Sequence, residues 1–311
     1  MSANRNSTST TRWLAGSGFL LLLISSACTD APQNTHVTRA DSTEPAALTV
    51  EVEDQPQDSI IVEERLAWAR SQQLDTLPIG QIVARMGRTF VGAPYIPGTL
   101  EVQGPERLVV NLREFDCVTF VESSLALARV VRAGKGGYGA FKNELRRLRY
   151  RGGQLDGYAS RLHYFSEWLA DNEAKGILQD ITQQLGGVPD DEPITFMSQH
   201  VESYRQLADS TQLSAVREIE TRLSGSPRYI IPANRIAAVA ARIQDGDVIA
   251  AASTLAGLDI AHTGIALRAG DQLHLMHAPL VGKAVEISEK PLAERIQGIN
   301  TQDGIMVARP R

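Results

Sequence analysis

The 311-residue sequence contains only two cysteines, Cys28 and Cys117. This number excludes a small domain held together by several disulfides and permits at most one disulfide within the chain. A long run of lysine and arginine is also missing, and the densest basic stretch, 146–151, fits the polar face and end of a helix. With a formal net charge of -5, the composition gives no reason to expect a nucleic acid as partner.

Long apolar segments are scarce as well. The apolar stretch from Trp13 to Ile24 is too short to span a bilayer comfortably. A basic, acid-free start precedes it and small residues follow it, and these are the parts of an export signal. We therefore expect a signal peptide at residues 1–27. Residues 28–59, which are rich in Thr, Asp, Glu, Pro and Gln, are expected to be a flexible tether, and residues 60–311 a folded domain.

The residues around Cys28 define how the export signal ends. Ser25-Ser26-Ala27 before Cys28 resembles a lipobox, the cleavage signal of bacterial lipoproteins, although Ser25 stands where leucine is usual. The resemblance implies a lipid on Cys28 as the chain's contact with a membrane. Thr29, rather than Asp, follows and implies the outer membrane, with the domain in the periplasm. Ordinary cleavage after Ala27 is the alternative.

Cys117 has no intramolecular partner if Cys28 carries lipid. A disulfide between them would require an uncleaved signal or cleavage further upstream. In an oxidising compartment an unpaired thiol is either a buried small apolar residue or a reactive group. Asp116 is a favourable N-cap and Gly134 a favourable stop, which predicts a helix from Asp116 to Ala133. Cys117 would lie in its first turn, where free N–H groups stabilise a thiolate or an oxyanion.

The remaining pattern changes from helices to strands along the chain. Helical spacing begins near Ile60, and further helix is expected from Pro78 to about Phe90 and over most of 138–225. Strand-like runs are expected at 108–112, 229–232, 247–250, 262–267 and 273–277. This order is typical of an α+β domain with an antiparallel sheet, here with a large helical insertion at about 138–225.

Three histidines lie in the strand-rich end. If 262–267 and 273–277 form a hairpin whose turn is centred on Ala269-Gly270, His262 lies opposite His277 on one face. His274 then pairs with Ile265 and faces the other way. A slip of one residue would bring His274 beside His262 instead. The first register favours His277 as the partner of His262, and a hydrogen-bonded structural role is the alternative for each histidine.

Several short motifs follow one another in a fixed order. Gly92-Ala93-Pro94-Tyr95 precedes Phe115-Asp116-Cys117-Val118-Thr119-Phe120-Val121-Glu122, and Gly246-Asp247-Val248-Ile249 precedes Ile260-Ala261-His262-Thr263-Gly264-Ile265. Together they resemble the NlpC-type peptidoglycan cysteine peptidases. Arg161-Leu162-His163-Tyr164, Gly257-Leu258-Asp259-Ile260 and Leu275-Met276-His277-Ala278 are similar to the N-acetylmuramoyl-L-alanine amidase-like branch, and the resemblance covers roughly 60–311.

The resemblance implies a papain-like core and a role for each matching residue. Cys117 would attack an amide carbonyl, His262 would accept its proton, and His277 would fix the imidazole tautomer. Tyr95 would line the active site and support the oxyanion; simple packing beneath the Pro94 turn is the alternative. No metal and no cofactor is expected, and the substrate would be a muropeptide or peptidoglycan.

The helical insertion contains candidate substrate-binding residues. We expect Arg161, His163, Tyr164 and His200 to line the cleft and contact the sugar or the peptide, with Arg161 suited to a substrate carboxylate. Helix caps and surface ion pairs are the alternative for the same residues.

The favoured activity is hydrolysis of the amide between muramic acid and L-alanine. Cleavage within the stem peptide, between D-Glu and a diamino acid, uses the same mechanism. A zinc hydrolase built on His262, His274 and His277 is a different class, but His274 and His277 cannot share a strand face. The last alternative is a non-catalytic lipoprotein that binds the wall.

Overall fold

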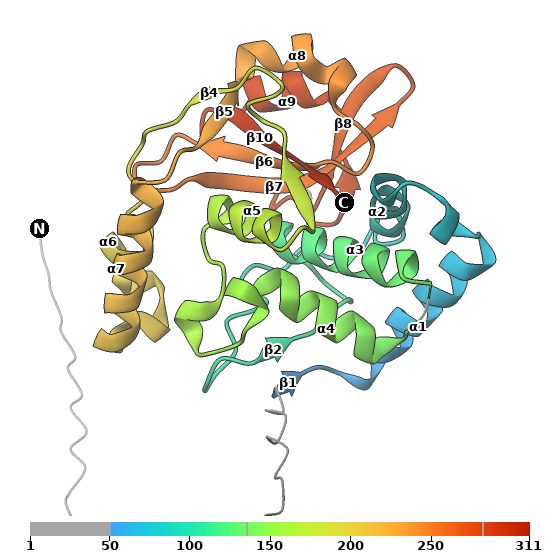
Figure 1. Cartoon of the computed structure of the whole chain (residues 1–311), viewed down its shortest axis with the longest axis horizontal. Helices are drawn as coiled ribbons and strands as arrows, with labels where there is room; N and C mark the ends of the chain where they lie inside the picture. Colours follow the sequence, from blue (N-terminus) through green and yellow to red (C-terminus); the bar gives the residue numbers. More distant parts are fainter. Residues whose placement is uncertain (1–50, 135, 282) are drawn as a thin grey trace, which may run out of the picture. The chain divides into compact units, whose positions relative to one another are not determined.

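The structure is a computed structural model that describes residues 51–134, 136–281 and 283–311 (Figure 1). The predicted signal peptide, Cys28 and the tether up to residue 50 lie outside the described residues. Secondary structure begins earlier than predicted, because a short strand at Val52–Glu53 and a helix from Pro56 both precede Ile60.

The described residues contain nine α-helices and ten β-strands, which confirms the predicted α+β class. The helices are α1 (Pro56–Ser71), α2 (Ile79–Arg88), α3 (Cys117–Arg132), α4 (Tyr138–Arg149), α5 (Phe165–Ala174), α6 (Phe196–Gln199), α7 (Ser210–Ser224), α8 (Ile236–Val239) and α9 (Leu292–Gln297). The strands are β1 (Val52–Glu53), β2 (Leu108–Val109), β3 (Leu178–Asp180), β4 (Val188–Pro189), β5 (Tyr229–Pro232), β6 (Val248–Ser253), β7 (Ile260–Ala269), β8 (Gln272–His277), β9 (Glu286–Ile287) and β10 (Gln302–Pro310).

Eight of the strands form one antiparallel sheet in the order β4-β5-β10-β6-β7-β8-β9, with β3 also pairing with β10. The last strand in the sequence, β10, therefore lies inside the sheet between β5 and β6. It was not predicted, because its apolar run Ile305–Ala308 is short and lies between Asp303-Gly304 and Pro310. The remaining pair, β1 and β2, is parallel and separate.

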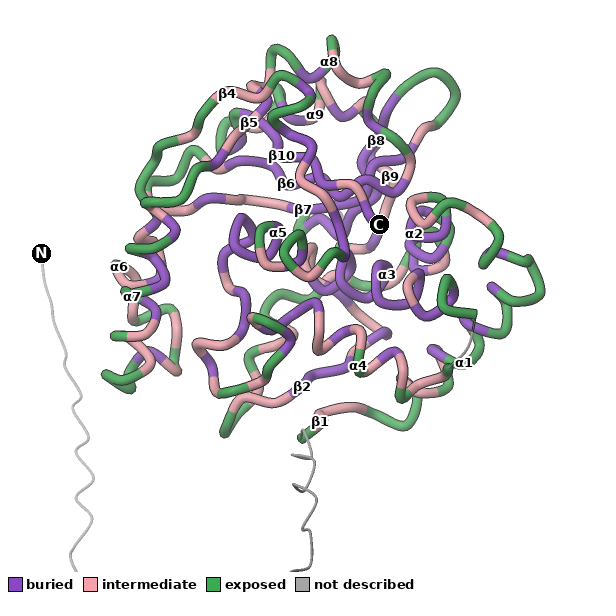
Figure 2. Tube along the Cα trace, viewed as in Figure 1, coloured by how far each residue is buried: buried purple, intermediate pink, exposed green. Residues whose placement is uncertain are grey.

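Helices cover both faces of the sheet (Figure 1). Alternate residues of the central strands face opposite sides: Val248, Ala250 and Ile265 pack in the core that contains α1 to α5. Ile249 and Ala266 pack in a second core with α8 and α9. Because both faces are covered, β6 is apolar throughout its first five residues and is drawn as buried in Figure 2.

The helix α3 runs through the middle of the larger core. Asp116 caps its N-terminus, and most of its side chains are buried on all sides, between α1, α2, α4 and β7. Glu122 of α3 is also buried and pairs with Arg149 of α4, with 2.8 Å between Oε2 and Nε. Arg149 also donates to Val109 O. The interpretation of Arg149 as part of a polar helix face is therefore wrong, because this guanidinium is held in the core by a buried carboxylate.

The segment 138–225 is largely helical, as predicted, and breaks at Gly152, whose φ of +57° suits glycine. It also contributes strands β3 and β4, which pair with β10 and β5. Around α6 and α7 it forms a third, separate apolar core.

The hairpin of β7 and β8 has a different register from the predicted one. Leu267 pairs with His274 and Ile265 with Met276, so the predicted pairing of His274 with Ile265 is wrong by two residues. The turn is formed by Gly270-Asp271, with Gly270 at φ +62°, as in a type II′ turn. Because the shift is an even number, the predicted faces are retained and His262 and His277 share one.

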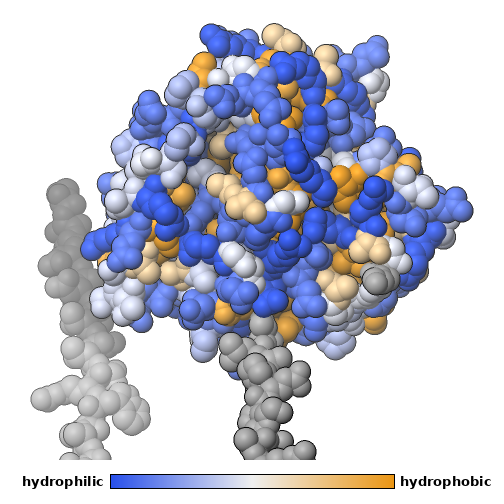
Figure 3. Space-filling model, in the orientation of Figure 1, coloured by the Kyte–Doolittle hydropathy of each residue, from blue (hydrophilic) through white to orange (hydrophobic). Residues whose placement is uncertain are grey.

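The surface seen in Figure 3 is mostly hydrophilic, and its hydrophobic side chains form small scattered patches. Such scattered exposure is normal for a folded domain in water. No helix among the described residues has the length and apolar character needed to cross a membrane.

Candidate functional site

Cys117 is the first residue of α3, as predicted. The carboxylate of Asp116 accepts from Thr119 N at 2.8 Å, and the Thr119 hydroxyl accepts from Asp116 N at 3.0 Å, so the N-terminus is fixed by a reciprocal cap. From the sheet, Thr263 Oγ1 donates to the carbonyl of Cys117 at 2.9 Å. This bond joins the start of α3 to β7, one residue from His262.

His262 and His277 form a hydrogen-bonded pair on neighbouring strands. The distance from His262 Nε2 to His277 Nδ1 is 2.9 Å, and the two rings meet edge to face at 4.9 Å between centroids. The pairing of β6 with β7 shifts beside His262, between Ala251 and Ala252. Such an irregularity changes the direction of a side chain at the end of a strand and is frequent near active sites.

The other nitrogen of His277 faces β9. Nε2 lies 3.8 Å from Glu286 Oε1, and His277 and Glu286 are direct partners in the β8–β9 ladder. His277 is buried and its Nε2 has no hydrogen-bond partner among the described residues, whereas the Glu286 side chain is 46% exposed.

Both imidazoles are held in the neutral form. Burial lowers the pKa of His262 to about 3, and the positive charge of Arg295 on α9 adds to this effect. Burial, His262 and then Arg295 lower the pKa of His277 to about 2. A neutral imidazole has a free lone pair, which is the form that a general base requires before the reaction.

The thiol of Cys117 is also neutral. Burial and the carboxylate of Asp116 raise its pKa to about 11, and hydrogen bonds from Thr263 and from the Cys117 backbone oppose this only in part. The free N–H groups at the start of α3 are expected to favour the thiolate, whereas burial and the neighbouring Asp116 favour the thiol. A neutral thiol has to lose its proton before or during attack on a substrate, because the thiolate is the nucleophile.

Tyr95 lies beside Cys117. Its strand-like segment is held between Phe115, with which it forms a parallel bridge, and Lys283, whose carbonyl accepts from Tyr95 N at 2.8 Å. Burial raises the pKa of Tyr95, and the negative charges that Cys117 and Asp116 can carry raise it further. The hydroxyl therefore remains protonated and can donate a hydrogen bond.

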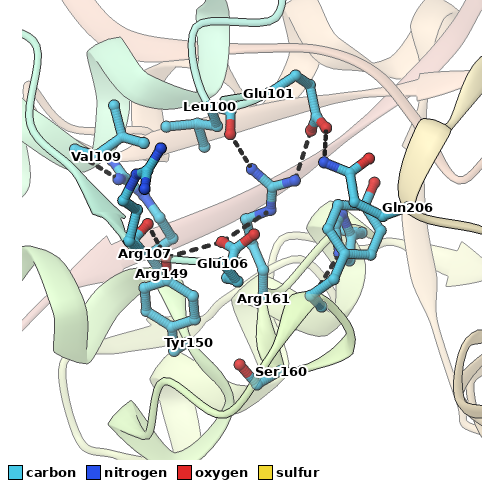
Figure 4. Close-up of polar contacts among 12 residues, drawn as sticks. Leu100, Glu101, Glu106, Arg107, Val109, Arg149, Tyr150, Ser160, Arg161 and Gln206 are labelled. Carbon is cyan, nitrogen blue, oxygen red and sulfur yellow. Dashed lines mark hydrogen bonds and ion pairs between the residues drawn. The ribbon is translucent and has the colours of Figure 1, made fainter. Parts of the chain in front are cut away.

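Arg161 lies in a buried polar network (Figure 4). Its guanidinium donates to Leu100 O at 3.1 Å and pairs with Glu101 at 2.5 Å and Glu106 at 3.6 Å. The pKa of Arg161 is raised because these carboxylates outweigh its burial. These contacts hold the segment 100–106, so the geometry favours the alternative of a structural ion pair over direct contact with a substrate carboxylate.

The other candidates from the insertion are also engaged within the protein. The hydroxyl of Tyr164 donates to Glu220 at 2.7 Å and accepts from Met197 N. His163 Nε2 lies 2.9 Å from Tyr158 O, and its pKa is lowered by burial and by Arg161. His200 Nδ1 lies 2.8 Å from Phe196 O. None of these contacts joins the side chains to Cys117, and their role in substrate binding stays a prediction.

His274 faces away from the His262–His277 pair, as its strand position predicts. Its Nδ1 lies 2.8 Å from Ser288 O. Among the residues that the structure describes, no group of three His, Cys, Asp or Glu side chains could hold a metal ion.

Three residues at this site were not predicted from the sequence. Thr263 follows His262 directly, and its position beside a candidate base is the one signal that could have identified it. Glu286 belongs to a strand of two residues and Arg295 to a helix of six, and neither has a motif of its own. Their proximity to the histidines depends on the folded chain.

Comparison with known proteins places this arrangement in a family. The model of a family described as AmiA-like, N-acetylmuramoyl-L-alanine amidase-like, matches residues 85–305. That range contains Tyr95, Cys117, His262, His277 and Glu286. No match was found among curated proteins.

Solved structures support the same relationship. A crystal structure of an N-acetylmuramoyl-L-alanine amidase from Bacteroides uniformis is 37% identical, with a TM-score of 0.72, over 75% of this chain and 99% of that one. A Bacteroides fragilis protein, named for a proposed xylanase activity, is 35% identical, with a TM-score of 0.68, over 72% and 99%. A Legionella pneumophila protein, 21% identical with a TM-score of 0.59 over 81% and 96%, shows the fold alone.

Proposed function

Since this chain belongs to the AmiA-like, N-acetylmuramoyl-L-alanine amidase-like family, we propose that it is a cell-wall hydrolase that cleaves the amide between N-acetylmuramic acid and L-alanine in peptidoglycan or muropeptides. The single observation that carries a cysteine mechanism is the hydrogen bond from Thr263, next to the His262–His277 pair, to Cys117 at the start of α3. It ties a nucleophile on a helix N-terminus to a base that has its own orienting partner.

In the proposed reaction, Nδ1 of His262 takes the thiol proton while Sγ of Cys117 attacks the lactyl carbonyl carbon. The carbonyl oxygen becomes an oxyanion, which backbone N–H groups at the start of α3 and the Tyr95 hydroxyl stabilise. The C–N bond then breaks, and the L-alanine nitrogen leaves with the proton from His262. A water molecule, deprotonated by His262, hydrolyses the thioester and releases the muramic carboxylate and the free thiol.

A papain-like core of the NlpC type is part of the proposal. The order along the chain supports it: the cysteine begins a buried helix, and the histidine and its polar partner follow on adjacent antiparallel strands. The direct packing of helix α3, which begins with Cys117, against β7, which contains His262, also supports it.

The proposed location is the periplasm, with a lipid on Cys28 holding the domain at the outer membrane. The motif that ends in Ser25-Ser26-Ala27-Cys28 supports it. Membrane fractionation and mass spectrometry of the mature N-terminus test this proposal. We expect a lipid-modified Cys28 in the membrane fraction and a soluble Cys28→Ala variant. An unmodified, soluble wild-type protein would contradict lipid anchoring.

The enzymatic proposal is tested by mass spectrometry of defined muropeptides incubated with the protein. Wild type, Cys117→Ala and His262→Ala are compared, each with and without EDTA, and xylan is the control substrate. We expect intact stem peptide to be released from the muramyl sugar by the wild type alone, with no effect of EDTA.

Other products would change the proposal in defined ways. Cleavage between D-Glu and the diamino acid would agree with the thiol mechanism but would show that the enzyme hydrolyses a different bond from the proposed one. Activity that survives in Cys117→Ala would remove the thiol mechanism. Binding of muropeptides without cleavage would indicate a wall-binding lipoprotein, and release of xylose oligomers would indicate a glycosidase.

A further inference from the structure

The hydrogen bond between His262 and His277 can exist in two forms. Both rings are neutral, so each has one N–H and one bare nitrogen. In the first form His262 Nε2–H donates to His277 Nδ1, which leaves Nδ1 of His262 bare and His277 protonated at Nε2. In the second form His277 Nδ1–H donates to His262 Nε2, and Nδ1 of His262 is protonated.

These two forms differ in their ability to catalyse. The first leaves a lone pair on Nδ1 of His262, the ring nitrogen that does not bond His277 and can take the proton of Cys117. In the second form the same nitrogen already has a proton, so it cannot act as a base. Because the 2.9 Å bond fits both forms, the distance alone does not select one of them.

The selection depends on what His277 Nε2 faces. That nitrogen is buried and has no hydrogen-bond partner among the described residues. The carboxylate of Glu286 faces it, with Oε1 at 3.8 Å, because the two residues pair in the β8–β9 ladder. A carboxylate attracts an N–H and repels a lone pair, so it favours protonation at Nε2.

We propose that Glu286 is a positioning residue that fixes the tautomers of His277 and, through it, of His262. The inference deepens the proposed function and rests on it for its meaning in catalysis. A separation of 3.8 Å exceeds a hydrogen bond, and the partly exposed Glu286 side chain can close it by a rotamer change. Even at 3.8 Å the negative charge of Glu286 acts on Nε2 of His277, because His277 is buried and charges are screened less there than in water.

The position of Arg295 is consistent with this role. Burial is the main reason why both histidines stay neutral, and the positive charge of Arg295 adds to it. Burial also lowers the pKa of Arg295, and the charge of Glu286 opposes that effect. One cation and one carboxylate therefore act on the same pair: Arg295 disfavours the imidazolium, and Glu286 selects between the neutral tautomers.

The test is NMR of the protein labelled with ¹⁵N-histidine, which assigns the protonated nitrogen of each ring without a substrate. We expect His262 and His277 of the wild type to be protonated at Nε2. Glu286→Leu should move a substantial fraction of both to Nδ1–H, and Glu286→Asp, which keeps the charge, should retain most of the wild-type form. Glu289→Leu is the matched control, since Glu289 is exposed three residues further along and its loss changes the net charge equally.

Kinetics on muropeptides provide the second readout. Complete loss of the correct tautomer costs on the order of 10⁴ in kcat where an orienting carboxylate touches the base directly. Because Glu286 acts through His277 and is half exposed, we expect a fall in kcat on the order of tenfold in Glu286→Leu, with KM unchanged. Glu286→Asp should recover most of it.

The results separate the inference from the proposed function. Wild-type His262 protonated at Nδ1, or tautomers that do not change in Glu286→Leu, would overturn the role of Glu286 whatever the activity. A tautomer change in Glu286→Leu would support that role even if no muropeptide is cleaved. The absence of cleavage would then contradict the proposed function without affecting the role of Glu286. Should Glu286→Leu not fold, the wild-type spectrum can still overturn the proposal, by showing Nδ1–H on His262.

Discussion

The surroundings of Cys117 and of Arg161 are both largely buried, but they differ in charge and in the number of partners. The thiol and the two imidazoles are neutral, one hydrogen bond joins the two imidazoles, and Nε2 of His277 has no hydrogen-bond partner among the described residues. Arg161 is charged, donates to a carbonyl and forms ion pairs with two carboxylates. The first region has groups available to change protonation, and the second is an ion-pair network that holds a segment of chain. Burial alone therefore does not distinguish a reactive site from a structural one.

The largest expected effect is in the first region. His262→Gln should reduce kcat on muropeptides at least 10³-fold, because the thiol loses its proton acceptor. The unfolding midpoint should stay close to that of the wild type, since glutamine can keep a hydrogen bond to His277. His36→Gln, in the predicted tether, is the control. If His262→Gln retained more than a tenth of the wild-type kcat, His262 would not be the general base.

The next largest effect is in the second region. Arg161→Ala should lower the free energy of unfolding by about 3 kcal/mol, since it leaves Glu106 buried without its cation. Urea denaturation measures this, and Glu106→Gln in the same variant should recover part of it. Arg205→Ala, which removes an exposed bond to Val102 O, should cost less than about 0.5 kcal/mol.

Kinetics of Arg161→Ala also test the predicted role in substrate binding. A raised KM with little change in stability would show that Arg161 binds substrate. The region around Arg161 would then be part of the functional site, like the region around Cys117. A loss of stability with KM and kcat unchanged would leave Arg161 as a structural residue only.

The neutral state of Cys117 predicts how fast it reacts with iodoacetamide. With a pKa of about 11, the thiolate fraction and hence the rate should rise about tenfold per pH unit between pH 6 and pH 9. The modified peptide is identified by mass spectrometry, and the denatured protein is the reference. A fast rate that is constant from pH 6 upward would instead indicate a resting thiolate–imidazolium pair.

The neutral histidines predict a smaller effect, on stability in acid. Above pH 6.5 both rings are neutral in the folded and the unfolded chain. Below that value the unfolded chain binds protons that the folded protein does not bind until about pH 3, so stability falls as the pH falls. Each histidine adds at most about 1.4 kcal/mol per pH unit to this decline. Urea denaturation between pH 7.5 and 4.5 should give a shallower decline for His277→Gln, and equal slopes would contradict the neutral pair.

The features of the site that the sequence predicts are those that depend on neighbouring residues, such as helix capping and the alternation of side chains along a strand. Asp116 as N-cap placed Cys117 at the start of a helix, and the two-residue period of a strand placed His262 and His277 on one face. The exact register was missed because it depends on whether the turn centres on Ala269-Gly270 or on Gly270-Asp271, which the composition does not decide.

The rest depends on contacts between distant parts of the chain. Glu286 reaches His277 through a two-residue strand, which has too few residues to show a periodic pattern. The sequence predicts Arg149 on a polar helix face and Arg161 in a substrate cleft, but each is buried and pairs with a carboxylate 27 or more positions away. Such pairings are chosen by the packing of the whole domain and leave no local signal.

The position of β10 has a consequence for the time at which this protein can fold. Residues 302–310 follow every other described strand in the sequence, yet they fill the space between β5 and β6. Until they emerge, β5 and β6 each expose an open edge, and the sheet is divided into two parts. A nascent chain of this protein therefore cannot complete its sheet before β10 has emerged, however early its helices form.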